Sequence, residues 1–179
     1  LHTVVRKNEV IFFSNDGMFI YKNKKIKVIQ SNSNFDELFE VDKDLYATDN
    51  SKGLLKLAND VFTPIKDGEK FKGMKIKKIF SSDNNLIILT QNQGLFAYKN
   101  HQLLPFATEA DYLLKQFQIS AAIQISGGYF AIGTRQTGLV IIDNEGHLIQ
   151  HINKQMGLQN EYVTNLKIDK EGNLWVTLK

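Results

Sequence analysis

Hydrophobic residues occur along this chain in short runs separated by turn-forming residues. Runs of four apolar residues lie at 10–13, 86–89, 129–132 and 139–142, with Gly, Asn, Asp or Ser residues around them. Runs of this length between turn signals predict buried β-strands rather than helices. The hydrophobic pattern therefore predicts a protein built mainly from strands.

One stretch has helical character instead. Thr108 is placed to cap a helix over 109–117, with Asp111 at the capping-box position. Leu113, Leu114 and Phe117 have the spacing of one helical face.

Four glycines divide the chain into similar repeats. Gly17, Gly53, Gly94 and Gly138 are each followed by apolar residues at +1, +2 and +4 and by Asn at +6, and they are spaced by 36, 41 and 44 residues. Repeats of about 40 residues made of short strands are typical of β-propeller blades. We therefore predict an all-β propeller with one blade per repeat.

Each repeat contains four strand-like pieces, named A to D from the inner to the outer edge of the blade. The predicted blades span about 1–30, 35–66, 74–106 and 118–152, and strands A and B alone account for a partial fifth at 162–179. Pro64 and Pro105, the two prolines, both fall in strand D. This supports the assignment, because a sheet tolerates proline at its edge. We treat 1–179 as one propeller fragment.

The last repeats resemble the two-component regulator propeller repeat. The stretch 157–177 runs from Gly-Leu through Val-Thr and an apolar strand to Gly-Asn-Leu-Trp, ending in Trp175, and 131–134 with Gly138 continues the pattern. The resemblance implies a seven-bladed ring, so we expect this chain to be a fragment. Such a fragment would form an open arc or be completed by another copy.

The same resemblance implies an extracytoplasmic or periplasmic sensor of a bacterial hybrid two-component system, with an oligosaccharide as a common cue. The membrane helix and histidine kinase of such a receptor lie outside the repeats. Some relatives carry a DNA-binding transcription regulator instead. The expected partners are the ligand, the rest of the receptor and, through open blade edges, further copies of the chain.

Composition and charge exclude several classes of function and binding partner. A net charge of +3 is too weak to indicate nucleic-acid or membrane-surface binding, and the absence of Cys excludes thiol chemistry and Cys-ligated metals. No apolar run approaches the 20 or so residues of a membrane span. His147 and His151 are four residues apart, about 13 Å on a strand, too far to share one ion. We predict no cofactor, no metal and no enzymatic activity for this segment.

Ligand contacts are expected where the loops gather. The B–C loops and the D-to-A connections share one face of a propeller, and rigid β scaffolds carry binding residues on such loops. Amide and Arg side chains suit hydroxylated or carboxylated sugars. The candidate ligand residues in these loops are Asp49, Asn50, Lys52, Gln91, Asn92, Arg135 and Gln136, beside the loop at Asn15 and Asp16. Solvated turns remain the simpler reading of any one of them, and we expect Trp175 and Tyr129 to pack between blades.

Three functions stay open on this basis. The first is a ligand-sensing propeller segment that performs no chemistry. The second is a protein-interaction or dimerisation propeller. The third is a propeller enzyme with a metal in its channel, ranked last because the sequence offers no convergent His, Asp and Glu set.

Overall fold

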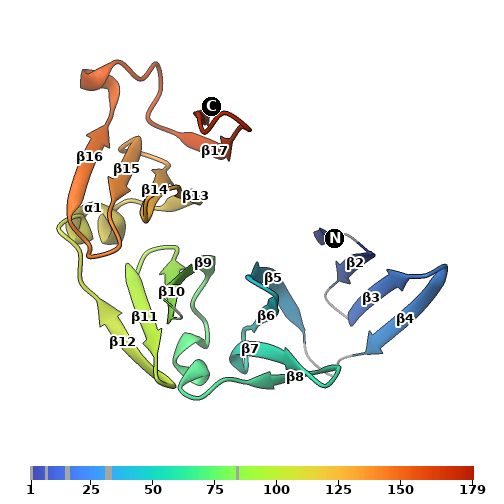
Figure 1. Ribbon diagram of the computed structural model, residues 1–179. Coiled ribbons are helices and arrows are strands. Elements are labelled where there is room, and N and C mark those ends of the chain that lie inside the picture. The colour runs from blue at the N-terminus through green and yellow to red at the C-terminus, as the bar shows by residue number, and fades with distance from the viewer. Residues whose placement is uncertain (1, 7, 15–16, 31–33, 84) are drawn as a thin grey trace. The chain divides into compact units, whose positions relative to one another are not determined.

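The computed structural model describes residues 2–6, 8–14, 17–30, 34–83 and 85–179. The chain forms two compact units, Leu1–Met74 and Lys75–Lys179. Each unit is built from antiparallel sheets whose strands follow one another in chain order (Figure 1).

The first unit contains two four-stranded sheets. The first sheet comprises β1 (His2–Arg6), β2 (Glu9–Ser14), β3 (Gly17–Lys22) and β4 (Lys25–Gln30). The second sheet comprises β5 (Phe35–Val41), β6 (Asp44–Asp49), β7 (Gly53–Ala58) and β8 (Val61–Pro64), and the 3₁₀ helix η1 (Gly68–Phe71) follows it.

The second unit contains two further four-stranded sheets and a two-stranded one. The third sheet comprises β9 (Ile76–Ser82), β10 (Asn85–Thr90), β11 (Leu95–Lys99) and β12 (Gln102–Phe106), and helix α1 (Asp111–Gln116) follows. The fourth comprises β13 (Ile119–Ile125), β14 (Tyr129–Thr134), β15 (Leu139–Ile142) and β16 (Leu148–Ile152). The 3₁₀ helix η2 (Lys154–Met156) leads to the two-stranded sheet of β17 (Val163–Ile168) and β18 (Leu174–Leu178).

The predicted strands are confirmed, and the helix is shorter than predicted. Every strand in the A-to-D reading is present, and both prolines lie in the edge strands β8 and β12. Helix α1 begins at Asp111 because Thr108 and Glu109, which precede it, form other hydrogen bonds. The Thr108 hydroxyl donates to the Asp111 carboxylate, and the backbone N–H of Glu109 donates to Gly146 O.

The repeat Asn at +6 forms the C–D hairpin turn. Asn23, Asn59 and Asn100 have φ of 51°, 50° and 51°, and the next residue in each turn also has positive φ. Two consecutive residues of this kind make the type I′ turn that matches strand twist, and Asn is favoured in it. The preference of Asn for this turn explains why Asn recurs at +6 in these repeats.

The repeat glycines open strand C for a different reason. Gly53, Gly94 and Gly138 have φ between 81° and 89°. A Cβ on Gly53 would also lie 2.1 Å from Gly68 O, and one on Gly138 would lie 2.2 Å from Ile152 O. Only glycine fits such a position. Gly17 pairs with Ser14 and Gln30 at the start of β3.

Successive sheets pack face to face within each unit. We call the side of a sheet that contacts the next sheet in the chain its forward face, and the opposite side its backward face. Between the first and second sheets the core comprises Ile11, Phe13, Met18, Ile29, Phe35, Leu38, Leu45, Ala47 and Leu55. Between the third and fourth sheets it comprises Phe80, Ile87, Leu89, Leu95, Ala110, Leu114, Ile119, Phe130, Ile132, Val140 and Ile142. Ala131 and Leu139 pack on Val163 and Leu166 of the two-stranded sheet. Strand alternation places successive residues on opposite faces, so one run of apolar residues serves two interfaces.

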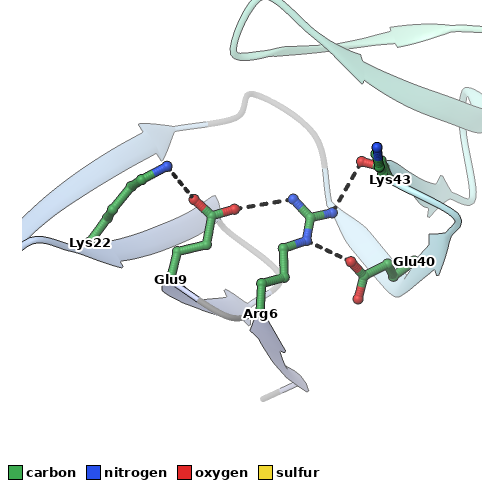
Figure 2. Close-up of polar contacts among 5 residues, drawn as sticks. All are labelled: Arg6, Glu9, Lys22, Glu40 and Lys43. Atoms are coloured by element: carbon green, nitrogen blue, oxygen red, sulfur yellow. Dashed lines mark hydrogen bonds and ion pairs between the residues drawn. The ribbon is translucent and has the colours of Figure 1, made fainter.

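An ion-pair network joins the first two sheets at their A–B turns (Figure 2). Arg6 Nε lies 2.5 Å from Glu40 Oε1, and its Nη2 donates to Lys43 O at 3.2 Å. Glu9 Oε1 accepts from Arg6 at 3.1 Å and Glu9 Oε2 from Lys22 at 3.2 Å. Burial opposes the Glu9 charge, but the hydrogen bonds from Arg6 and Lys22 outweigh it and lower the pKa of Glu9. The network therefore favours one alignment of the two sheets.

Candidate functional site

Backbone hydrogen bonds tie the B–C loops to the D-to-A connections in the second unit. Gln91 N donates to Lys75 O at 2.8 Å, and Gln91 O accepts from Ile119 N at 3.0 Å. Arg135 N donates to Gln118 O at 2.9 Å. These bonds place the loops of the third and fourth sheets at one end of the unit, as predicted.

The last residue of strand B closes each B–C loop. Thr90 Oγ1 donates to Gly94 O and accepts from Gln93 N, at 2.8 and 3.0 Å. Thr134 makes the equivalent bonds to Gly138 O and from Thr137 N, at 3.1 and 2.9 Å. A side chain with an oxygen that bonds its own loop is favoured here over any apolar residue.

Asp49 occupies the same position in the second sheet and is a loop-closing residue. Its Oδ1 accepts from Ser51 N at 2.7 Å, Ser51 Oγ at 2.6 Å and Lys52 N at 3.0 Å, and only 2% of the residue is exposed. Burial opposes its charge, but these bonds outweigh the burial and lower the pKa of the carboxyl group. The structure thus gives Asp49 a turn role in place of the predicted ligand contact.

The other candidates fall into two groups. Asn50 and Lys52 are exposed in the first unit, and Asn50 O accepts from Gly73 N at 3.3 Å. Gln91 is half-buried, and Asn92, Arg135 and Gln136 are exposed in the second unit. Asn15 and Asp16 lie outside the described residues. Gln91 and Arg135 are both hydrogen-bonded to the segment 118–119 through their backbone groups.

A tyrosine ring close to two cations is the most distinctive feature of this loop surface. Arg135 Cζ and Lys179 Nζ each lie 5.5 Å from the centre of the Tyr162 ring. Cations at this distance over an aromatic face are attracted to it. Tyr162 N donates to Asn160 Oδ1 at 3.0 Å, which helps to hold the ring in place.

Two amide side chains lie on the loops that carry Arg135 and Tyr162. Gln136 Oε1 accepts from Gln118 N at 3.3 Å, and Asn160 Nδ2 donates to Lys179 O at 2.9 Å. We define Arg135, Gln136, Asn160, Tyr162 and Lys179 as the ring site. The ring site offers an aromatic face, positive charge and planar amides on half-buried or exposed side chains.

Sequence reasoning missed Asn160, Tyr162 and Lys179. Asn160 and Tyr162 lie in the D-to-A connection that follows the fourth sheet, and Lys179 directly follows β18. Because those connections share a face with the B–C loops, their polar and aromatic residues belonged among the candidates.

The histidines and aromatic residues have local partners. His147 Nδ1 lies 2.8 Å from Asp143 Oδ2, and His151 Nε2 lies 2.7 Å from Thr137 O. Trp175 is 63% exposed and donates to Asp169 Oδ2 at 2.8 Å, and Tyr129 is also exposed. Trp175 therefore braces the hairpin turn at Asp169 and does not pack between sheets as expected.

Two absences can be stated for the described part of the chain. No three His, Cys, Asp or Glu residues there are grouped so as to hold a metal ion. No helix there is long and apolar enough to cross a membrane.

Comparison with solved structures gives clear matches. The extracellular domain of BT3049 from B. thetaiotaomicron, assigned to a hybrid two-component system, superposes with a TM-score of 0.72 at 16% identity. The match covers 98% of this chain and 25% of that domain, so the chain spans about a quarter of its length. No protein-family model matches the chain, and no curated protein does.

Two further structures establish the architecture. The WD40 β-propeller domain of Doa1 gives a TM-score of 0.68 at 13% identity, with 97% of this chain and 58% of that one covered. The fold is that of β-propeller blades. Virginiamycin B lyase from Staphylococcus aureus gives 0.70 at 14% identity, with coverages of 98% and 61%. The three similar structures are named as an extracellular domain of a hybrid two-component system, a WD40 domain and a lyase, so the blades alone do not assign a function.

Proposed function

We propose that this chain is a ligand-sensing segment of an extracytoplasmic sensor propeller and that its ligand is an oligosaccharide bound at the ring site. The observation that carries the proposal is the Tyr162 ring with Arg135 against it, beside the amides of Gln136 and Asn160. A sugar ring has an apolar face that packs on an aromatic side chain and hydroxyls that bond amides and guanidinium groups.

The surroundings of Tyr162 support recognition rather than catalysis. The loops are bonded to one another through the backbone, so the ring site is held in place before a ligand arrives. Arg135 and Lys179 add positive charge, which favours sugars that carry carboxylate groups. The similarity to an extracellular sensor domain agrees with this role and with a location outside the cytoplasm.

Isothermal titration of the full-length extracytoplasmic protein against neutral and acidic oligosaccharides tests the proposal. We expect Tyr162→Ala to weaken binding by about 5- to 30-fold, since loss of the aromatic contact with the sugar removes about 1–2 kcal/mol. Tyr129→Ala is the matched control, because Tyr129 is an exposed tyrosine at the A–B end of the same sheet as Arg135.

Two results would contradict the proposal. One is that no sugar in the panel binds. The other is that Tyr129→Ala weakens binding as much as Tyr162→Ala does.

A further inference from the structure

The backward face of the first sheet is an exposed apolar surface. Val10, Phe12, Phe19, Tyr21 and Ile26 line a hollow of about 450 Å³ on this face. The strand register places them together, because Phe12 pairs with Phe19, and Tyr21 pairs with both Val10 and Ile26. Phe19 is 40% exposed, Tyr21 43% and Ile26 67%.

The repeat pattern identifies what such a face contacts. Phe19 and Tyr21 are the residues at +2 and +4 from the repeat glycine. In the fourth sheet these positions are Val140 and Ile142, which are 0% exposed because the third sheet covers them. In the second sheet the +2 position is Leu55, which is buried against the first sheet.

Strand B gives the same comparison. Phe12 occupies the place of Ala47 in the second sheet and Ile132 in the fourth, judged by the residues they pair with in strand C. Ala47 and Ile132 are both buried under the preceding sheet. The exposed backward face of the first sheet thus corresponds to the backward faces of the second and fourth sheets, each of which is covered by the preceding sheet.

We propose that this face docks a further propeller blade of the same polypeptide. That blade is a four-stranded sheet whose apolar forward face resembles the one that Ile11, Phe13 and Met18 present to the second sheet. The inference rests on the proposed function in one respect, namely that the chain is part of a longer sensor propeller. The similar BT3049 domain, of which this chain spans about a quarter, has room for such a blade.

A sheet suits this face better than a small ligand does. The lining residues offer apolar side chains from three adjacent strands, and the hollow has no charged group. Sheets pack at about 10 Å through interdigitated side chains, which covers a broad and shallow surface of this kind.

Thiol labelling of the full-length protein tests the proposal. The chain has no cysteine, so a single introduced thiol can be followed by mass spectrometry of its peptide. Ile26→Cys places the thiol on β4 in the proposed interface, and Ile149→Cys places it on β16, where the isoleucine is 50% exposed. Both isoleucines lie on the outer strand of a four-stranded sheet, so they form a matched pair.

We expect maleimide to label Ile26→Cys at least about tenfold more slowly than Ile149→Cys, at every protein concentration. Equal labelling would overturn the proposal, because the face would then be open to solvent. Slow labelling that becomes fast on dilution would also overturn it and would identify a second copy as the occupant.

Two points keep the test decisive. Val5→Cys is a smaller change on the same face and serves if Ile26→Cys fails to fold. Sugar titration of these variants is independent of labelling, so failure of the sensor proposal and failure of blade docking are separate results.

Discussion

Gly133, near the end of β14, permits a close approach between the fourth sheet and the two-stranded sheet. A Cβ at this position would lie 2.4 Å from Val163 Cγ1 and 2.7 Å from Val163 Cβ. Val163 is 0% exposed, and the Ser120 hydroxyl bonds both Val163 O and Gly133 O. Val163 therefore has little room to move away from an added methyl group.

We predict that Gly133→Ala lowers the free energy of unfolding by about 1–3 kcal/mol, the usual effect of overpacking a tight interface. The φ of Gly133 is not in the left-handed region, so the effect is steric. Trp175 is the sole tryptophan and lies on β18, beside the strand that carries Val163. Urea unfolding followed by Trp175 fluorescence and by far-UV circular dichroism measures the loss.

A double mutant separates the steric cause from others. Val163→Ala alone removes two buried methyl groups and costs about 1.6 kcal/mol before any cavity contribution. In Gly133→Ala/Val163→Ala the 2.4 Å contact with Val163 Cγ1 is removed, while the 2.7 Å approach to the Cβ of residue 163 remains. The clash is partly relieved, so we expect the combined loss to be smaller than the sum by about 1 kcal/mol.

A second glycine provides the control. Gly172 has φ of 87° and no atom within 4 Å of an added Cβ. Gly172→Ala should cost about 1–2 kcal/mol through backbone strain alone, and Val163→Ala should not change that cost. The reasoning is refuted if Gly133→Ala is as stable as the wild type or if its effect simply adds to that of Val163→Ala.

Three other predictions concern single side chains. Leu114 is fully buried in the core between the third and fourth sheets, so Leu114→Ala should cost about 2–5 kcal/mol in thermal or urea unfolding. Thr134→Val keeps the shape of the side chain but loses both hydrogen bonds that close its loop, and should cost about 1–3 kcal/mol in the same assay. Hydrogen bonds from Trp175, first, and then Asn173 lower the pKa of Asp169 from 3.8 to about 2. Because the folded-state pKa is lowered, the ionised carboxylate stabilises the hairpin fully above pH 3.8, and this stabilisation is lost as the pH falls through about 2. Trp175 fluorescence should therefore titrate near pH 2, and the transition should vanish in Asp169→Asn.

Strands and turns could be predicted because they depend on neighbours in the chain. Alternation of apolar residues, the Asn at +6 and the repeat glycines act over two to seven residues, and they locate every strand to within a few positions. The helix was overestimated for the opposite reason. Glu109 bonds Leu148 N and Gly146 O, which lie far away in sequence, and those bonds compete with helix formation.

The candidate site residues also divide into those that the sequence could identify and those that depend on the folded structure. Arg135 and Gln136 could be selected from the sequence, since they stand in a polar loop after a strand. Asp49 stands in a loop of the same kind but is turned inward, because three donors of its own turn converge on its carboxylate. Residue type alone does not distinguish a carboxylate that closes a turn from one that faces a ligand.

The repeat period and the order of strands within each blade follow from local pattern, because β-pairing between consecutive strands needs only a short turn and a buried face. The pairing of Tyr162 with Arg135, the contact of Gly133 with Val163 and the burial of one sheet face but not its equivalent required the folded chain. Each of these depends on atoms more than twenty residues apart or on which sheet lies against which, and such distances are set by packing between sheets.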